Sequence, residues 1–502
     1  MKTLLINLTD SPSLIFPVMQ EILISNGHEC KNIQVPLEDA SDKYIEQIAK
    51  QIVSICPESK LIGISCITNT YLACINLIKN LRKFSKSKIV VGGVHPTVKP
   101  NEFNGYADYV CVGEGEEALL ELVNKLDKNK RTDNIPNIYT FQNGKLKINS
   151  LRPLLKNLNN LPTPKFNFNE TYLENQGKIY KLADKKELIK KFYSKYYFII
   201  TSRGCPYRCT YCLNNALIKI SSEYIVIRRR NNEHILNELR NFKKIIPKGN
   251  IIGFVDDDFC AQPLENLKQF CELYKQEINL PFFCASTPSS MNEDKLKVLL
   301  NAGLIRLEIG VQTISDRINK EVFGRYATKN QVINLVKILE KYRHKLQICY
   351  DFILDNPWET DETRLETLNF ILSLKKPFTA FIFSLTTYPG TELFERAKSE
   401  GILKKDSDIY KKNHMILENN KINTLWVLYN KYHFHKNIIK LFIANRNHWP
   451  LNYILEKSTY LLLRTYNYFY GLKDSLNRKD KHLRDYYLLA PFKLLIKKIK
   501  EL

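Results

Sequence analysis

The sequence predicts an α/β chain in three parts: a doubly wound (flavodoxin/Rossmann-like) parallel sheet, a partial (β/α)6 TIM barrel and a mainly helical C-terminal region. Short aliphatic runs alternate with helical patterns up to about residue 126, which predicts the first sheet. A second alternating series starts near residue 195 and predicts the barrel. Beyond about residue 402 the helical pattern continues without a strand series.

The first sheet is expected to contain five strands, which read KTLLINL, ECKNIQV, LIGIS, KIVVGG and ADYVCV in chain order. Helical patterns near residues 19–25 and 44–53 separate the first three of them. In a doubly wound sheet, ligands bind at the carboxyl ends of the strands, near the point where the strand order switches. The loops that follow these strands are therefore expected to form a binding site.

The barrel is expected to contain six strands, which read YYFIITS, NIIGFVD, PFFCAS, LIRLEIG, LQICYDFIL and FTAFIFSL. Because catalytic groups of such barrels gather at strand carboxyl ends, the polar residues that close each strand become candidates. We place the domain limits at 1–130 for the first domain, 131–194 for a linker region with local structure, 195–401 for the barrel and 402–502 for a basic helical region.

The composition favours a cytoplasmic protein. The 12 cysteines are sparse in a chain of 502 residues, and only one group is tight, as in a reducing compartment. Asn7 and Asp10 interrupt the N-terminal apolar run, so a β-strand is expected there and not a secretory signal. No uncharged apolar stretch reaches the ~18 residues that a membrane-spanning helix requires.

The chain is strongly basic, with a formal net charge of +23. Lys and Arg abound in every segment, and their excess is largest from Lys421 to the C-terminus, where Tyr, Phe and Trp are interleaved. This region is expected to be a solvated helical cap. Contact with a membrane surface or an acidic substrate stays open, and nucleic acid is the less favoured partner.

Cys205, Cys209 and Cys212 form one tight group directly after the first barrel strand, on a loop that Gly204 opens. Three thiolates at this spacing can wrap one compact metal centre and leave one iron of a 4Fe-4S cluster without a protein ligand. A structural zinc site would need a fourth ligand nearby, and His234 is the closest downstream histidine. Zinc and a thioredoxin-like CTYC pair stay open as alternatives, but the spacing favours the cluster.

This C-x3-C-x2-C spacing, with Tyr211 before the last cysteine, resembles the signature of the radical S-adenosylmethionine superfamily over roughly residues 195–400. The resemblance implies that the open iron binds the amino and carboxylate groups of S-adenosylmethionine. One electron from the cluster would then cleave it to methionine and a 5'-deoxyadenosyl radical, which abstracts hydrogen from a substrate. The resemblance also implies an anaerobic enzyme with an external one-electron donor such as flavodoxin or ferredoxin.

The polar strand ends resemble the S-adenosylmethionine contacts of that superfamily. Asp257 and Asp258 in GFVDDDF resemble the element that holds the methionine amino group, with an acidic helix cap as the alternative. RLEIGVQTISD resembles the family's IEIGVQSGS pattern, so its polar groups either bind the ribose and carboxylate or satisfy buried backbone. The expected contacts are Tyr211, Asp257, Asp258, Ser286, Glu308 and Gln312. Four further residues are expected to shape the site: Asp355, Glu359, Pro389 and Thr391.

LIGISCITNT, VVGGVHPT and YVCVGEGEE resemble, in order and spacing, the cobalamin-binding domain that precedes the barrel in one large class of radical enzymes. Gly92 and Gly93 would let backbone approach a bulky ligand, and Ser65 and Thr68 would offer hydroxyls to its nucleotide tail. Turns and helix caps in a purely structural domain are the alternative. The expected cobalamin contacts are Ser65, Thr68, Gly92, Gly93, His95, Gly113 and Glu114.

The loop after the first strand departs from the D-x-H-x-x-G pattern of domains that place a histidine on cobalt. It reads LTDSPSLIFP, with Asp10 but no histidine. Cobalt is therefore expected to lack a histidine ligand from this loop. His95 is expected to make hydrogen bonds and not to replace that ligand.

Together these resemblances imply a cobalamin-dependent radical enzyme that methylates an unactivated carbon of a small molecule, lipid or peptide. A radical cyclase or rearrangement enzyme stays open. A methylthiotransferase would need three N-terminal cysteines for a second cluster, but Cys30 and Cys56 are expected to be buried apolar residues. A corrinoid or iron–sulfur sensor that binds nucleic acid is the non-catalytic alternative.

Overall fold

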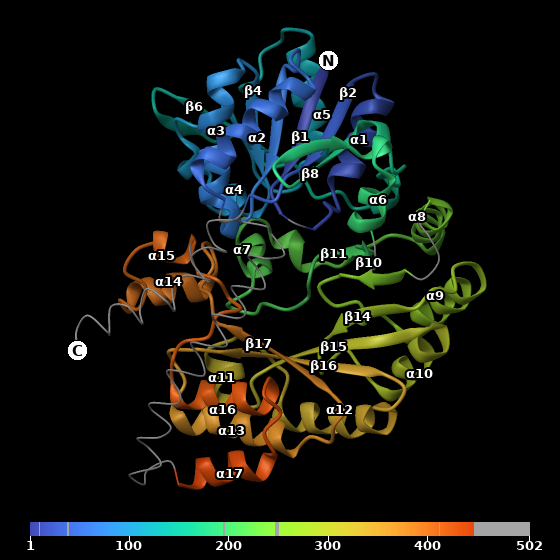
Figure 1. The fold of residues 1–502 in the computed structure, drawn as a ribbon, viewed down its shortest axis with the longest axis vertical. Helices are drawn as coiled ribbons and strands as arrows, with labels where there is room; N and C mark the ends of the chain where they lie inside the picture. Colours follow the sequence, from blue (N-terminus) through green and yellow to red (C-terminus); the bar gives the residue numbers. More distant parts are fainter. Residues whose placement is uncertain (10, 38–39, 194–195, 246–249, 411, 446–502) are drawn as a thin grey trace. The chain divides into compact units, whose positions relative to one another are not determined.

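The computed structural model describes residues 1–9, 11–37, 40–193, 196–245, 250–410 and 412–445 (Figure 1). The chain forms two compact units. The first comprises Met1–Glu308, Phe323–Arg325 and Thr387–Lys412, and the second Ile309–Val322, Tyr326–Thr386 and the residues from Asn413 onward. Within the described residues, none of the helices has the length and apolar character needed to span a membrane.

The first unit begins with a nine-stranded sheet in the order β7-β6-β5-β4-β3-β1-β2-β8-β9. Its five central strands are β1 (Lys2–Asn7), β2 (Glu29–Gln34), β3 (Leu61–Ser65), β4 (Lys88–Gly92) and β5 (Tyr109–Cys111). All neighbouring pairs among these five are parallel. The strand order switches between β1 and β3, which confirms the predicted doubly wound sheet.

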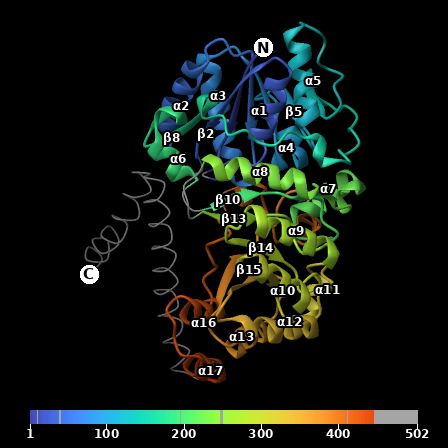
Figure 2. The same cartoon turned by 90° about the vertical axis from the view of Figure 1, so that its right-hand side faces the viewer.

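Helices cover both faces of this sheet (Figures 1 and 2). On one face, α2 (Asp42–Ile55) and α3 (Tyr71–Phe84) bury aliphatic side chains against the strands. On the other face, α1 (Phe16–Ser25) and α5 (Glu116–Asp127) form a second apolar core. Each helix buries one stripe of apolar residues against the sheet, so both faces of the sheet are shielded from water. A ligand site is therefore expected at the strand ends.

The region expected as a linker extends the sheet at both edges. Its elements are β6 (Ile138–Gln142), β7 (Lys145–Lys147), β8 (Thr171–Asn175), β9 (Lys178–Lys181) and α6 (Lys186–Phe192). The β6–β7 and β8–β9 pairs are antiparallel hairpins. Their two-residue turns, Asn143–Gly144 and Gln176–Gly177, have positive φ at both positions, as tight hairpins require. The local structure expected here is therefore part of the sheet, while the domain limits stay predictions.

The predicted parallel barrel sheet is confirmed. Its strand order is β10-β13-β14-β15-β16-β17, with parallel pairing of β10, β13 and β14 in the first unit and of β16 and β17 in the second. The strands are β10 (Tyr196–Ile199), β13 (Ile251–Phe254), β14 (Phe282–Ser286), β15 (Leu304–Gln312), β16 (Gln347–Leu354) and β17 (Thr379–Ser384).

Helices follow the barrel strands in both units. In the first unit, α8 (Asn232–Ile245), α9 (Leu264–Glu277) and α10 (Glu293–Ala302) alternate with the strands (Figure 2). The helices α11 (Asp316–Glu321), α12 (Lys329–Tyr342) and α13 (Asp361–Ser373) belong to the second unit. A small two-stranded ladder of β11 (Ser202–Arg203) and β12 (Arg228–Arg229), with α7 (Leu213–Ile220) between them in sequence, follows β10.

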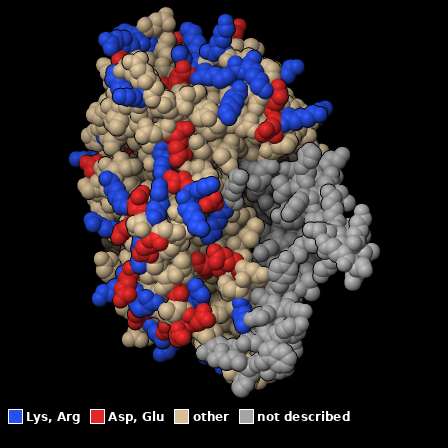
Figure 3. Space-filling model, turned by 90° about the vertical axis from the view of Figure 1, so that its left-hand side faces the viewer, with Lys and Arg blue, Asp and Glu red and all other residues tan. Residues whose placement is uncertain are grey.

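The C-terminal region is helical as far as it is described. It contains α15 (Ser407–Tyr410), α16 (Lys421–Asn430) and α17 (Lys436–Ala444), and α14 (Glu392–Ser399) directly precedes it. Most of the basic region after Lys421 lies outside the described residues, so its contacts with a membrane surface or nucleic acid stay predictions. On the face that Figure 3 shows, Lys and Arg side chains lie among Asp and Glu side chains.

Candidate functional site

The three cysteines of the predicted cluster site lie on one loop between β11 and α7. The Cys205 backbone N–H donates to the Tyr224 carbonyl at 3.2 Å, and the Cys212 N–H donates to the Cys209 carbonyl at 3.0 Å. Gly204 has a φ of +96°, and a Cβ there would lie 2.9 Å from the Tyr224 carbonyl oxygen. Only glycine therefore lets the loop begin in this conformation.

The three thiols influence one another electrostatically. Burial raises the pKa of Cys205 to about 12 and the pKa of Cys212 to about 11. The negative charges of Asp257 and Cys209 contribute to both raised pKa values, so the three thiols and this carboxylate lie near one another. Because cysteine binds a metal as the thiolate and not as the thiol, iron binding would displace protons from these cysteines.

The donor set suits a 4Fe-4S cluster better than a single ion. In a 4Fe-4S cube each thiolate binds a different iron, so the sulfurs stand farther apart than they do around one ion. A tetrahedral zinc site would need a fourth Cys or His ligand. The three cysteines could therefore hold a cube with one iron free for a small ligand.

Arg325 approaches this loop from a distant part of the sequence. Its Nη1 lies 3.8 Å from the Cys209 Sγ and 3.0 Å from the Tyr211 hydroxyl. The Tyr211 ring packs edge-on against Phe323, with 4.9 Å between the centroids. Sequence reasoning missed Arg325, because it follows no barrel strand and belongs to no motif. Its guanidinium therefore places a positive charge beside the cluster loop.

The three consecutive aspartates after β13 occupy different environments. Asp256 is buried, and its Oδ1 accepts hydrogen bonds from the Thr201 N–H at 3.0 Å, the Thr201 hydroxyl at 2.9 Å and the Ser202 hydroxyl at 2.5 Å. Asp258 is also buried, and it accepts from the Thr287 hydroxyl at 3.0 Å. Asp257 is exposed and is the aspartate whose charge reaches the cysteines.

The other expected S-adenosylmethionine contacts are dispersed. Ser286 lies 2.9 Å from the Ser290 hydroxyl, in the same network that holds Asp258. Glu308 in the first unit pairs with Arg306 at 2.8 Å. Gln312 lies in the second unit with a φ of +67°. Tyr211 and Asp257 therefore lie at the cysteine loop, Asp258 and Ser286 lie in the network at the neighbouring strand ends, and the S-adenosylmethionine contacts stay predictions.

Of the further residues expected to shape the site, Asp355 and Glu359 lie in the second unit. Asp355 accepts a hydrogen bond from the Glu418 N–H at 2.9 Å. Burial raises the pKa of Glu359 to about 7. Thr391 in the first unit caps α14 by accepting from the Phe394 N–H at 3.2 Å, which is a structural contact.

A cavity of about 430 Å³ opens at the carboxyl ends of the nine-stranded sheet. Part of its lining is apolar: Phe16 and Met19 of α1, Leu119 of α5, and Leu5 and Val90 of the strands. Five expected cobalamin contacts line it: Ser65, Gly92, Gly93, Gly113 and Glu114. The residues that begin the cysteine loop line it too, namely Ser202, Arg203 and Gly204, together with Asp256 and Asp257.

Thr68 and His95 are the expected cobalamin contacts that do not line this cavity. Both are buried, with 3.3 Å between the His95 Nδ1 and the Thr68 hydroxyl. The other ring nitrogen, Nε2, lies 3.1 Å from Glu102. Glu102 in turn accepts from the Tyr410 hydroxyl at 2.6 Å. His95 therefore makes the hydrogen bonds expected of it. None of the described residues that line the cavity is a histidine, and Asp10 lies outside the described residues.

Gly93 is needed for a reason other than ligand access. Its φ is +104°, and a Cβ at this position would lie 2.7 Å from the Cys66 carbonyl oxygen. Gly92 has no such restriction, because its Cβ would make an ordinary contact with Cys111 at 3.5 Å. Gly93 thus permits the close approach of its loop to the loop that contains Cys66. Gly92 has no side chain and so leaves space in the cavity wall.

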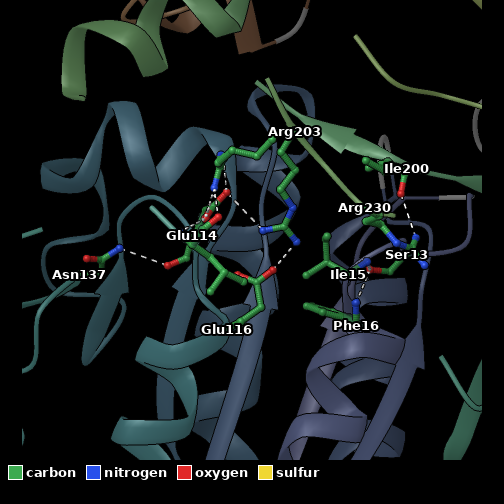
Figure 4. A network of polar contacts seen from close by, with 11 residues as sticks. Ser13, Ile15, Phe16, Glu114, Glu116, Asn137, Ile200, Arg203 and Arg230 are labelled. Carbon is green, nitrogen blue, oxygen red and sulfur yellow. Dashed lines mark hydrogen bonds and ion pairs between the residues drawn. The ribbon is translucent and has the colours of Figure 1, made fainter. Parts of the chain in front are cut away.

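Two arginines that sequence reasoning missed join the cavity wall to the cysteine loop. Arg203 lies 3.3 Å from Glu114 and 2.5 Å from Glu116 (Figure 4). Arg228 lies 2.8 Å from Glu114. Burial alone would raise the pKa of Glu114, but its hydrogen bond with Arg228 and the charge of Arg203 hold that pKa below its ordinary value. The Glu114 carboxylate is therefore ionised at neutral pH. Its ion pair and that of Glu116 hold Arg203, the residue directly before Gly204, in place.

The N-terminal cysteines are divided between the two faces of the sheet. Cys56, Cys66 and Cys74 belong to the core under α2 and α3, whereas Cys30 and Cys111 belong to the core under α1 and α5. All five are buried. Cys30 and Cys56 are therefore the apolar core residues that the sequence predicted, and this arrangement gives no support to a second cluster.

Comparisons with known proteins match both the N-terminal sheet region and the barrel region of the chain. Residues 199–371 match the Radical SAM superfamily, and residues 10–123 match the B12 binding domain. An uncharacterized methyltransferase of Pyrococcus horikoshii is 26% identical over 387 residues, which cover 76% of this chain and 77% of the relative. The two matched domains imply a 4Fe-4S cluster, S-adenosylmethionine and cobalamin as cofactors.

Two solved structures share the fold. The cobalamin-dependent S-adenosylmethionine radical enzyme OxsB, with aqua-cobalamin and S-adenosylmethionine bound, gives a TM-score of 0.66 at 17% identity, covering 98% of this chain and 83% of that chain. The radical S-adenosylmethionine methyltransferase TsrM from Kitasatospora setae, with cobalamin and a 4Fe-4S cluster bound, gives a TM-score of 0.61 at 16% identity, covering 80% and 75%. These likenesses confirm the predicted fold.

Proposed function

Because the chain belongs to the radical S-adenosylmethionine superfamily and carries an N-terminal B12-binding domain, we propose that it methylates an unactivated carbon by cobalamin-dependent radical chemistry. One observation carries the proposal. Ser65 and Gly92 of the sheet line the same cavity as Arg203, Gly204 and Asp257 beside the cysteine loop. A methyl donor and a radical source would thus share one enclosed space.

When bound, the cluster with S-adenosylmethionine supplies the radical that removes hydrogen from substrate, and cobalamin supplies the methyl group. Cys205, Cys209 and Cys212 hold the cluster. The exposed Asp257 carboxylate would pair with the methionine ammonium group by charge.

The cavity residues suit a corrinoid. Phe16, Met19 and Leu119 would offer an apolar surface to its aromatic base. Ser65 would supply a hydroxyl from the same cavity. None of the described residues that line the cavity is a histidine, so none of them could give cobalt an imidazole ligand.

Methyl transfer is favoured over other radical outcomes by the relatives. The Pyrococcus horikoshii protein and TsrM both carry the name methyltransferase. Enzymes of this superfamily need an external one-electron donor, and we expect a flavodoxin or ferredoxin in that role. The substrate class stays open among small molecules, lipids and peptides.

Anaerobic reconstitution with iron, sulfide and cobalamin tests this proposal. After reduction with dithionite in the presence of S-adenosylmethionine, we expect formation of 5'-deoxyadenosine together with the visible absorption of bound corrinoid. A full cluster that forms no 5'-deoxyadenosine would contradict radical chemistry. Failure to bind corrinoid would contradict cobalamin-dependent methylation, even if 5'-deoxyadenosine appears.

A further inference from the structure

The helix α17 exposes apolar side chains that a helix of a globular protein normally buries. It is the last helix of the described chain, and six of its nine residues are apolar (Figure 1). Ile439 is fully buried, but Ile438 and Leu441 are 42% and 57% exposed. Because Ile438 and Leu441 are three residues apart in a helix, they lie on the same side of it. One side of α17 therefore packs in the second unit, and another presents aliphatic side chains to the outside.

The turn before α17 adds two exposed aromatic rings. Tyr432 and Phe434 are 41% and 39% exposed. The turn is held to α16, because the Tyr432 N–H donates to the Val427 carbonyl at 3.2 Å and the Phe434 N–H donates to the Leu428 carbonyl at 3.0 Å. Single exposed apolar residues are common on proteins, but a group of them on one short segment marks an interaction site. We call Tyr432, Phe434, Ile438 and Leu441 the α17 surface.

The charge around the α17 surface has one sign. Residues 419–445 contain four lysines and no Asp or Glu: Lys421, Lys431, Lys436 and Lys440. Lys436 and Lys440 belong to α17 itself, and both are exposed. The segment therefore offers apolar side chains and cations together, so its partner should be both apolar and anionic.

This combination is typical of helices that lie in the interface of an anionic bilayer. Such helices insert aliphatic and aromatic side chains at the boundary between headgroups and acyl chains, while lysines reach the lipid phosphates. Nine residues are too few for α17 to cross a bilayer, which takes about 20 residues in a helix. A helix of this kind would therefore lie on the membrane surface.

Charge makes the other possible occupants less suitable. Residues 446–502 contain 12 Lys or Arg and 5 Asp or Glu, so placing them on the α17 surface would bring like charges together. The α17 surface of a second copy of the chain meets the same objection. A nucleic acid would satisfy the lysines, but Ile438 and Leu441 have no ring on which a base can stack. Anionic phospholipids satisfy both the lysines and the aliphatic side chains.

We propose that the α17 surface binds the surface of an anionic phospholipid bilayer. Phe434, Ile438 and Leu441 enter the boundary between headgroups and acyl chains, and Lys436 and Lys440 pair with lipid phosphates. The inference concerns the second unit alone and uses none of the residues assigned to the cluster or the cobalamin cavity. It therefore does not depend on the proposed function.

Sedimentation of the full chain with lipid vesicles tests this proposal. We expect vesicles of phosphatidylcholine and phosphatidylglycerol to bind the native protein at least roughly tenfold more tightly than vesicles of phosphatidylcholine alone. High salt should weaken this binding, because it screens the attraction between lysines and phosphates. A native protein that does not bind the anionic vesicles would overturn the proposal.

Two double variants of the full chain locate the contact. Ile438→Ser with Leu441→Ser should lower the affinity for anionic vesicles roughly tenfold or more, because it removes aliphatic area that enters the bilayer. Lys436→Gln with Lys440→Gln should also lower it roughly tenfold. The matched control is Ile148→Ser, at a 67% exposed apolar residue of the first unit, which should leave the affinity unchanged. Circular dichroism and urea unfolding would verify that each variant keeps its fold, as expected for exposed positions.

Equal vesicle affinities of the native protein and both double variants would overturn the assignment to α17, since another part of the chain, such as residues 446–502, would then bind the lipid. Salt-sensitive RNA binding by a native protein that ignores vesicles would also contradict the proposal and identify nucleic acid as the partner. Corrinoid binding and 5'-deoxyadenosine formation are measured without vesicles. Failure of the membrane proposal would therefore leave the proposed function standing, and the reverse also holds.

Discussion

The cysteine loop and the cavity wall would hold their proposed cofactors in different ways. The loop takes its three thiols from nine consecutive residues, 204–212, and Gly204 and the Cys212–Cys209 hydrogen bond set its shape. The wall collects single groups from several strand ends and from β11 and β12. A change in the loop should therefore remove a cofactor outright, whereas a change in the wall should weaken binding by degrees.

The largest effect is expected at the loop. Cys209→Ala should abolish the cluster, because two thiolates leave two irons of the cube without protein ligands. Iron content and 5'-deoxyadenosine formation should both fall to background, while corrinoid binding remains. Cys271→Ala, at a buried cysteine of α9 outside the loop, should keep the cluster. A Cys209→Ala protein with full iron content would refute the assignment of this ligand.

Gly204→Ala should be the next most severe change. Positive φ costs an alanine about 1–2 kcal/mol, and the clash with the Tyr224 carbonyl adds a further ~1–3 kcal/mol. The free energy of unfolding in urea measures the sum. Gly27→Ala is the matched control, since Gly27 also has positive φ but a Cβ there would meet nothing within 4 Å. Equal losses in the two variants would mean that the loop start is not tightly packed.

Glu114→Gln should have an intermediate effect that depends on pH. The folded pKa of Glu114 lies below its ordinary value of 4.5, so the ionised carboxylate stabilises the fold above that pH. We expect the variant to lose about 1–3 kcal/mol of unfolding free energy at pH 7. This deficit should shrink as the pH falls below 4.5 and through the folded pKa of Glu114. Glu58→Gln, at an exposed ion pair, should change little at either pH.

The smallest effects separate two predicted cobalamin contacts. Ser65→Ala removes a hydroxyl that lines the cavity and should raise the Kd for corrinoid a few fold. Thr68→Val removes the hydroxyl beside His95 and should lower the unfolding free energy by about 1 kcal/mol without changing that Kd. Corrinoid titration and urea unfolding of both variants would show this division. A Thr68→Val protein with weaker corrinoid binding would extend the site beyond the cavity.

The features that were predictable from sequence are those encoded by short-range patterns. The spacing of Cys205, Cys209 and Cys212 lies within one loop, and each central strand is a continuous aliphatic run. The hairpins with turns at Asn143–Gly144 and Gln176–Gly177 were not predicted beyond local structure in this region, because a turn does not reveal which sheet edge its strands join.

The features that were missed depend on contacts between distant residues. Arg203 and Arg228 meet Glu114 across about ninety and more than a hundred residues, and no local pattern marks them. Arg325 reaches Cys209 in the same way. Thr68 and His95 lie close in sequence to cavity residues, yet their side chains turn into the core and pair with each other. The sequence therefore predicted which loops form the cavity, but not which side chains of those loops line it.

The central claim is that the corrinoid and the cluster occupy adjoining parts of one unit. Electron paramagnetic resonance of the reconstituted protein with bound cob(II)alamin tests it directly, because two nearby paramagnetic centres broaden each other's signals. We predict that reducing the cluster broadens the cob(II)alamin signal in the native protein but not in Cys209→Ala. An unchanged cob(II)alamin signal, with both sites fully occupied and the cluster reduced, would contradict the account.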